Sequence, residues 1–327
     1  MSQQDDAYPL VVRDKPSRFS CFPILNPELW RIYKDEALPS TWFADDIDLS
    51  NDLKDWKEKL TDNERHFLKH VLCFFAGMDS VVAENLSINF VEELKVLEIT
   101  MFYQWQAFNE QIHAETYATI IDTYFDDAAE KAFVFDAVRS MPVIAAKAQW
   151  ALGFSHRESS SFAKRLVAFI CLEGIMFAGS FASIFYFRSR GLLRGLSQAN
   201  DYIQRDETLH VRFAIEVYAL LKERLPESEV HEIFRTAVAL EETFLTEALP
   251  VNLVGLRNGD MVEYIRYVAD FWLVHMGYSK IYEANNPLDF MRRSALVTKP
   301  NFFEVRATEY QTVSSDKQSL FDEAATF

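Results

Sequence analysis

The stretch LVAFICLEGIMFAGSFASIFYF occupies residues 166–187 and contains a single ionisable side chain, Glu173. A helix of about 20 apolar residues is long enough to cross a membrane. A carboxylate near the centre of such a helix is costly, and it marks a function whether the surroundings are lipid or protein. No second run of this kind is evident in the sequence. We therefore predict that residues 166–187 form a buried core helix of a soluble protein.

Segments with helical periodicity flank this run. Apolar residues recur three and four positions apart over roughly 61–86, 91–124, 161–188 and 197–224. Thr61 and Glu64 open the first of these as a capping box, and shorter helices are expected near 128–139, 143–151, 228–247 and 260–284. The chain has only 9 Gly and 10 Pro, and it lacks alternating strand patterns joined by tight turns. The predicted fold class is all-α.

Two of the long helices carry the pattern Glu-x-x-His, at Glu110–His113 and at Glu207–His210. Three residues turn an α-helix by about 300°, so the two side chains of each pattern share one face. One such pattern is weak evidence, because chance produces it often. Each is preceded, however, by an acid in an apolar run: Asp79 lies in FFAGMDSVVAENL and Glu173 in the central run. The first acid lies 31 residues before the glutamate of its pattern and the second acid lies 34 residues before, so the two spacings are similar.

This repeated arrangement predicts a site for two metal ions. Four carboxylates and two imidazoles would be prohibitive to bury alone, since each buried ion costs several kcal/mol. Two divalent cations would balance the four negative charges. The arrangement is that of ferritin-like dinuclear carboxylate proteins, and oxygen with imidazole ligands suits iron or manganese rather than a thiolate zinc site. The candidate ligands are Asp79, Glu110, His113, Glu173, Glu207 and His210. The alternative is a set of unrelated acids and histidines on helix surfaces.

Tyr117 follows His113 by four residues and projects from nearly the same helix face. It could be an ordinary core tyrosine. Beside a metal pair that activates oxygen, it would instead be an oxidisable phenol in a dry pocket. Three apolar residues near the acids could form the wall of that pocket: Phe177, Phe181 and Ile203.

A second pair of histidines, His66 and His70, lies one helical turn apart and could also bind metal. Arg65 and Lys69 adjoin them, which favours an exposed helix face.

The composition restricts the partners and the compartment. With 33 Lys plus Arg against 49 Asp plus Glu, the net charge is −16, which disfavours binding to nucleic acid and to anionic membrane surfaces. The 3 cysteines have no ligand-like spacing, and two lie in apolar runs, as expected of reduced thiols in a cytoplasmic protein. The start of the chain lacks a signal-peptide pattern.

The chain is expected to divide into three parts. Residues 1–35 hold four prolines and are predicted to be irregular, residues 36–290 to form one helical domain, and residues 291–327 to form a flexible tail. The polar end of the tail, residues 311–327, either frays or serves as a tether whose terminal Phe327 anchors it to a partner.

Several longer motifs resemble the small, radical-generating subunit of class I ribonucleotide reductase, most closely its eukaryotic and viral members. The resemblance runs over nearly the whole chain, from RFSCFPI near residue 18 to the tail. The motifs that carry it are WFADDIDLS, FFAGMDSVVAENL, NEQIHAETY, LEGIMFAGSFASIF, QRDETLH, FLTEALP and NFFEVRATEY. Together they are far more specific than Glu-x-x-His.

The resemblance implies a ferritin-like helical bundle that holds two iron ions per chain. Asp79, Glu110 and His113 would bind one iron, and Glu173, Glu207 and His210 the other. Oxygen and a reductant would convert Tyr117 to a stable tyrosyl radical. The radical would pass to the large subunit, which reduces ribonucleotides to deoxyribonucleotides, along a route that matches Trp42, Asp206 and Tyr310 here. Asp206 adjoins a ligand and could also orient an imidazole.

The resemblance further implies a homodimer whose C-terminal tail docks on the large subunit. All six ligand positions carry metal-binding residues, and Tyr117 disfavours the subclass with Phe and a manganese–iron cofactor at that position. Two alternatives stay open at this stage. One is another ferritin-like di-iron oxidase, such as a desaturase or a ligand-binding oxidase, and the other is an iron-storage protein.

Overall fold

The computed structural model describes residues 9–12, 14, 18, 20–85, 90–136, 141–155, 160–248 and 256–291, with backbone but not side chains described at 79–85, 92, 155 and 248. These ranges contain no β-sheet; an isolated antiparallel bridge joins Leu10 to Leu221. The prediction of an all-α fold is confirmed. In chain order the helices are α2 (Pro27–Arg31), η1 (Ile32–Ala37), α3 (Leu38–Ser40), η2 (Ala44–Asp46), α4 (Asp52–Lys54), η3 (Asp55–Lys59), α5 (Asp62–Asn85), α6 (Val91–Glu93), α7 (Leu97–Tyr124), α8 (Ala128–Phe135), α10 (Pro142–Ser155), α11 (Phe162–Cys171), η5 (Leu172–Met176), α12 (Ala178–Ser189), α13 (Arg194–Ala219), α14 (Glu227–Ala248) and α15 (Asn258–His275).

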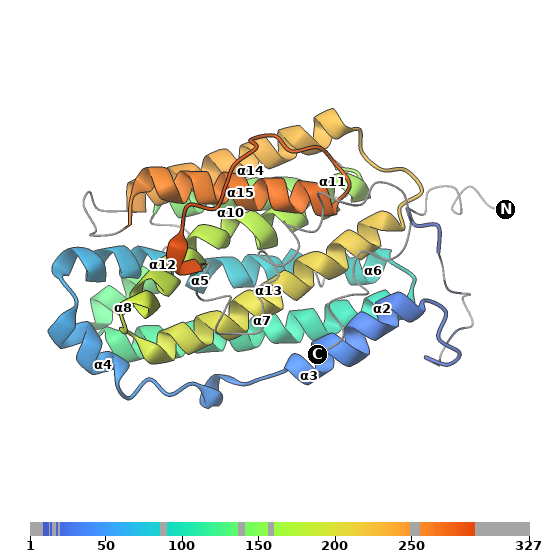
Figure 1. Ribbon diagram of the computed structural model, residues 1–327. Helices are drawn as coiled ribbons and strands as arrows, with labels where there is room; N and C mark the ends of the chain where they lie inside the picture. The colour runs from blue at the N-terminus through green and yellow to red at the C-terminus, as the bar shows by residue number, and fades with distance from the viewer. Residues whose placement is uncertain are drawn as a thin grey trace.

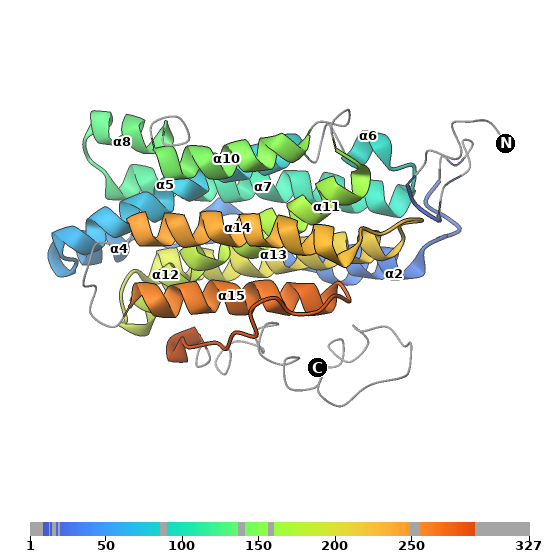
Figure 2. The same cartoon turned by 90° about the horizontal axis from the view of Figure 1, so that it is seen from above.

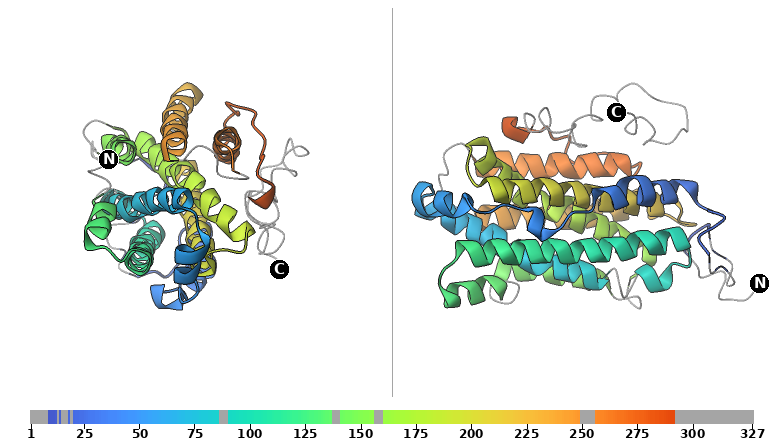
Figure 3. Two further views of the ribbon diagram at one scale, coloured as in Figure 1. Left: turned by 90° about the vertical axis from the view of Figure 1, so that its left-hand side faces the viewer. Right: turned by 90° about the horizontal axis from the view of Figure 1, so that it is seen from below.

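The long helices form a bundle (Figure 1). Helix α5 packs against α7, α12 against α13, and α14 against α15. In the view of Figure 1, α13 crosses α7 obliquely, whereas α7, α14 and α15 run roughly along one direction, as the views from above and from below also show (Figures 2 and 3). Helix α13 contacts both α7 and η5. These contacts make neighbours of the helical segments that carry both Glu-x-x-His patterns and Glu173.

The apolar run lies at the centre of the bundle. Residues Phe162–Ser189 are long and apolar enough to cross a membrane, but the most apolar window is 100% buried inside the protein. The prediction of a core helix is confirmed. Ser161 begins it as an N-cap, accepting a hydrogen bond from the backbone N–H of Lys164.

This core helix differs from the prediction in one respect, because residues Leu172–Met176 form a π-helical turn rather than part of an α-helix. Neighbouring helices supply partners for the backbone there. Trp272 Nε1 donates to the Gly174 carbonyl at 3.1 Å, and Lys147 Nζ donates to the Met176 carbonyl at 3.0 Å. A side chain could not replace the hydrogen of Gly174, because its Cβ would lie 2.7 Å from Trp272 Nε1. Glu173 occupies this turn, and π-helical turns are frequent at functional sites.

The start of α5 confirms the predicted capping box. Thr61 N donates to Glu64 Oε2 at 2.8 Å, and Glu64 N donates to Thr61 Oγ1 at 3.3 Å.

Other predicted boundaries were wrong. Residues 27–35, expected to be irregular, are helical, because Pro27 occupies the start of α2, where its missing N–H costs nothing. The segment 91–124 breaks at residues 94–96. The fourth long helix begins at Arg194 and ends at Ala219, a few residues before each predicted limit.

Helix α15 ends at His275 rather than near residue 284. Gly277 adopts a left-handed φ of 84°, which costs glycine little. Tyr278 N then bonds to the Leu273 carbonyl at 2.9 Å, and Gly277 N bonds to the Val274 carbonyl at 3.0 Å. This pattern is a Schellman motif, and Gly277 was the sequence signal for it.

Candidate metal centre

Three helical segments bring five of the six candidate ligands together. Helix α7 presents Glu110 and His113, the π-helical turn presents Glu173, and α13 presents Glu207 and His210. All five side chains are at most 3% exposed. Because Glu-x-x-His puts both groups of each pattern on one helix face, α7 and α13 can turn their two patterns toward one another across the core.

The two imidazoles present the same ring nitrogen to the carboxylates. His210 Nδ1 lies 3.2 Å from Glu110 Oε1, 3.1 Å from Glu173 Oε2 and 3.2 Å from Glu207 Oε2. His113 Nδ1 lies 3.1 Å from Glu207 Oε1 and 3.4 Å from Glu110 Oε2. Carboxylates of one motif therefore contact the imidazole of the other.

The cluster strongly perturbs its own protonation. Burial raises the pKa of Glu173 well above its usual value, and the negative charges of Glu207 and Glu110 raise it further. Burial alone would lower the pKa of His113, but its hydrogen bonds to Asp206 and to nearby glutamates outweigh burial and raise it well above 6.5. The pKa of His210 is raised in the same way, by Glu110 first. The buried cluster thus has more carboxylates than imidazoles, and bound positive charge would stabilise it.

The residues fit a metal centre by chemistry and by geometry. Glu110, Glu173, Glu207 and His210 each offer a ligand atom, and these atoms all lie within 4.8 Å of one another. Glu173 Oε1 is buried and accepts no hydrogen bond within the described part of the chain. A buried carboxylate oxygen without a donor is costly unless a cation compensates it. Oxygen and imidazole donors suit iron or manganese.

Asp206 collects hydrogen bonds behind His113. Its Oδ2 accepts from Trp42 Nε1 at 2.7 Å and lies 3.3 Å from His113 Nε2. Arg205 donates to the other oxygen, Oδ1, from Nε at 3.2 Å and from a terminal nitrogen at 3.0 Å. Trp42, in the loop after α3, also stacks on the His113 ring, with centroids 6.0 Å apart. Burial tends to raise the pKa of Asp206, but hydrogen bonding to His113 lowers it, so the carboxylate stays charged.

Tyr117 lies one turn beyond His113 on α7 and is 0% exposed. Its ring stacks on Phe75 with centroids 4.3 Å apart and planes 9° apart. Phe177 and Phe181 lie against the same Phe75 ring, at 5.8 and 5.2 Å. Ile203, on α13, is 1% exposed. The sequence reasoning missed Phe75, although it sits in the FFAGMD motif four residues before Asp79.

Asn109 was also missed. It is 0% exposed and lies between Asp206 and His210, within hydrogen-bonding distance of both. A polar residue immediately before the glutamate of each pattern, Asn109 and Asp206, was the available signal.

Two other predicted site residues lie outside what the structure describes. The backbone of Asp79 belongs to α5, but its side chain is not among those described, and Tyr310 also lies outside the described residues, with the predicted tail from residue 292 on.

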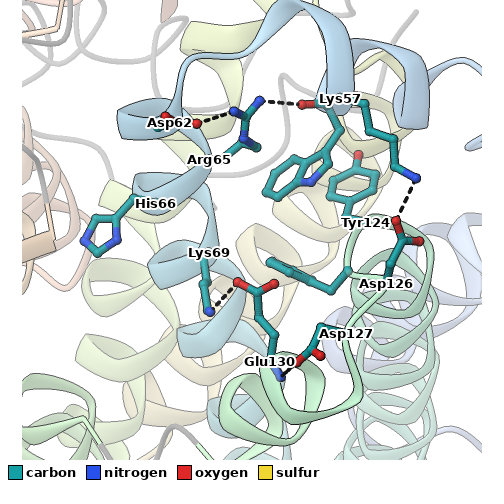
Figure 4. A pocket seen from close by; sticks show the side chains of 11 residues that line it. Lys57, Asp62, Arg65, His66, Lys69, Tyr124, Asp126, Asp127 and Glu130 are labelled. Carbon is teal, nitrogen blue, oxygen red and sulfur yellow. Dashed lines mark hydrogen bonds and ion pairs between the residues drawn. The ribbon is translucent and has the colours of Figure 1, made fainter.

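The other histidine pair lies in a different environment. His66 is exposed and lines a surface pocket of about 520 Å³ between α5 and α8 that shares no residue with the buried cluster. Its ring points away from the carboxylates there, which pair with cations instead: Lys57 with Asp126 at 2.7 Å, and Lys69 with Glu130 at 2.6 Å (Figure 4).

Comparison with known proteins decides the family. Residues 18–287 match the family described as "Ribonucleotide reductase, small chain". The chain belongs to the ribonucleotide reductase small-chain family.

Its relatives match over most of their length. The ribonucleoside-diphosphate reductase small subunit of Dictyostelium discoideum is 44% identical over 95% of this chain and 91% of its own. The corresponding protein of Nicotiana tabacum is 46% identical over 93% and 92%. A homodimeric ribonucleotide reductase structure from Saccharomyces cerevisiae superposes with a TM-score of 0.80 at 30% identity, covering 91% of each chain.

The chain is therefore a small subunit of ribonucleoside-diphosphate reductase with the ferritin-like fold of its family. The desaturase and ligand-binding oxidase alternative is not favoured, and neither is iron storage. In this small subunit the buried Glu/His cluster is the candidate metal centre.

Proposed function

We propose that the centre binds two iron ions, with manganese as the alternative, and that it generates a stable radical on Tyr117. Asp79, Glu110 and His113 would hold one ion, and Glu173, Glu207 and His210 the other. The observation that carries the proposal is the convergence of buried carboxylates and two Nδ1 atoms from separate helices. When bound, the iron pair would supply one-electron oxidation with O2 as the oxidant and an external reductant.

Tyr117 suits the role of radical carrier. The phenol would lose one electron and its hydroxyl proton, which leaves a neutral radical. Complete burial keeps water away from the ring, and the stacked Phe75 has no hydroxyl or thiol that could quench it. The position one turn beyond His113 supports this role, because residues four apart lie on nearly the same face of a helix.

The route out of the centre would run through Trp42 and Asp206 to Tyr310. The described part of this route is continuous, since the indole bonds to Asp206, and Asp206 contacts His113. We propose that the receiver is the large catalytic subunit, that the tail of residues 291–327 docks there, and that the small subunit is a cytoplasmic homodimer. Phe177, Phe181 and Ile203 would form the dry wall around Tyr117.

The radical assignment is tested by Tyr117→Phe. Removing the hydroxyl should leave metal loading intact and abolish turnover in an assay with the large subunit. Tyr103→Phe is the matched control, because Tyr103 is a second fully buried tyrosine of α7, two turns before Glu110. The control should keep its turnover. Turnover by Tyr117→Phe would refute the assignment.

The docking role is tested by deleting residues 311–327. The shortened chain should form the same radical and lose only the activity measured with the large subunit. Full activity without these residues would overturn the proposed tail contact.

A further inference from the structure

The two Glu-x-x-His patterns share a further feature, which becomes evident when they are compared. Each glutamate is immediately preceded by a residue with a short polar side chain, Asn109 before Glu110 and Asp206 before Glu207. Both are 0% exposed. Each lies four residues before the histidine of its own pattern, yet each contacts the histidine of the other pattern: Asp206 meets His113, and Asn109 meets His210.

The contacts of Asn109 fix the orientation of its amide. Asn109 Nδ2 lies 3.1 Å from Asp206 Oδ2, and Asn109 Oδ1 lies 3.0 Å from His210 Nε2. A charged carboxylate only accepts hydrogen bonds, so the amide NH₂ must face Asp206. The amide oxygen therefore faces His210, and a hydrogen bond forms there only when His210 Nε2 carries a proton.

That proton determines which nitrogen is left for a metal. A neutral imidazole has one N–H and one free lone pair, so a proton held at Nε2 leaves the lone pair at Nδ1. Nδ1 is the atom that faces Glu110, Glu173 and Glu207. Asp206 sets the same choice for His113, whose Nε2 faces it.

We propose that Asn109 is a positioning residue of the metal centre, which holds His210 with Nδ1 toward the carboxylates and joins it to Asp206. The inference rests on the proposed two-metal site. One continuous hydrogen-bonded chain then runs from His113 through Asp206 and Asn109 to His210. Trp42 enters this chain at Asp206, so the bonds that orient both imidazoles meet at the carboxylate that also holds the indole.

The substitution Asn109→Leu tests the proposal, because it removes both hydrogen bonds and keeps a side chain of similar size. The probe is Co²⁺, titrated into the metal-free full-length protein. Wild type should bind two ions. In the variant, one ion should bind about 10–100-fold more weakly, as when other orienting partners of metal ligands are removed, and the other ion should bind unchanged.

A spectroscopic readout identifies the affected imidazole. Each Co²⁺-bound imidazole with a proton on Nε2 gives a shifted proton resonance that disappears in D₂O. Wild type should show two such signals, and Asn109→Leu should keep the His113 signal and lose or broaden the His210 signal through faster exchange with water. Asn109→Ala should do the same, and its smaller side chain keeps the test open if the leucine variant does not fold.

Asn200→Leu is the matched control. Asn200, on α13, is likewise a buried asparagine. Its amide donates to the Phe181 carbonyl at 3.3 Å and contacts neither imidazole. It should keep both Co²⁺ affinities and both signals. Unchanged affinities and signals in the Asn109 variants would overturn the inference and leave the proposed function standing. Failure of wild type to bind two ions would overturn the proposed metal centre itself.

Discussion

At the scale of single residues, Asp206 links the two imidazoles of the site through its hydrogen bonds. It accepts hydrogen bonds from Trp42, Asn109 and Arg205 and contacts His113, so it orients one imidazole directly and the other through an amide. Its charge is retained in a buried setting only because so many donors face it.

We expect Asp206→Asn to weaken metal binding at the His113 side. The amide of the variant cannot satisfy all the donors that now meet the carboxylate, and an NH₂ group turned toward His113 Nε2 would oppose its proton. The expected loss is about 10–100-fold in affinity for one of two Mn²⁺ ions, measured by equilibrium dialysis. Asp201→Asn is the control, because Asp201 lies on the same helix but pairs with Arg188 at 2.5 Å. An unchanged affinity in Asp206→Asn would contradict this account of Asp206.

The sequence predicted which residues form the site better than it predicted the contacts between them. Glu110, His113, Glu207 and His210 follow from helical spacing, and Glu173 from the oddity of one acid in an apolar run. Asn109 and Phe75 were missed because nothing in one helix shows which side chain of another helix it will meet. The crossed pairing of the two patterns depends on how α7 and α13 are docked, and that is a property of the packed bundle.

At the scale of elements, a buried ion pair contacts the C-terminal end of the π-helical turn Leu172–Met176. Lys147 and Glu241 are both 0% exposed and form an ion pair, and Lys147 Nζ lies 3.8 Å from the centre of the Phe74 ring. Lys147 also donates to the Met176 carbonyl, and Glu241 Oε1 accepts from Gly179 N at 3.2 Å. Burial lowers the pKa of Lys147 to about 8 and raises that of Glu241. The pair therefore connects α10 and α14 to the C-terminal end of the turn that carries Glu173 and to the first residues of α12.

We expect Lys147→Met to reduce the free energy of unfolding by about 3–5 kcal/mol, because it leaves the Glu241 carboxylate buried without its cation. The double variant Lys147→Met with Glu241→Leu should recover most of that loss, since replacing both charges is often nearly neutral. Urea unfolding measures both. If the single and double variants were equally unstable, packing rather than charge pairing would be the main contribution.

Glu98, near the start of α7, connects this helix to the segment before α2 through hydrogen bonds. It accepts from Arg18 at 2.7 Å and from Leu25 N at 2.9 Å. Burial opposes its ionisation, but these bonds prevail and lower its pKa to about 2. A lowered pKa contributes stability above the unfolded value of 4.5, and this contribution is lost as the pH falls toward 2.

Glu98→Gln should therefore lower the free energy of unfolding at pH 7 by about 1–2 kcal/mol, allowing for solvent screening, and the deficit should shrink between pH 4.5 and 2. Glu28→Gln, in α2, is the control, since its pair with Arg31 is only partly buried and should matter less. A deficit that did not depend on pH would show that charge is not the cause.

Helix existence was predictable from periodicity, but helix ends and the π-helical turn were not. Pro27 and Gly277 each carried a usable signal, as an N-terminal proline and a C-terminal glycine. The turn at Glu173 carried none, because its backbone partners are Lys147 and Trp272, which are distant in the sequence.

At the scale of the whole molecule, the helical bundle excludes water from the buried cluster of glutamates and histidines. A helix apolar enough for a membrane lies fully buried at the centre, and its single acid joins two Glu-x-x-His patterns there. The predicted fold class and family are confirmed, while the identity of the metal and the radical remain proposals. Family membership and the buried cluster together support a metal centre built from protein carboxylates and imidazoles.

The most direct test is electron paramagnetic resonance of the metal-free protein after addition of ferrous iron and oxygen. Wild type and Tyr103→Phe should give a tyrosyl doublet with the relaxation of a radical near an iron pair, and Tyr117→Phe should give none while binding the same two irons. A doublet that persists in Tyr117→Phe, or wild type that takes up iron without forming any tyrosyl signal, would contradict the account.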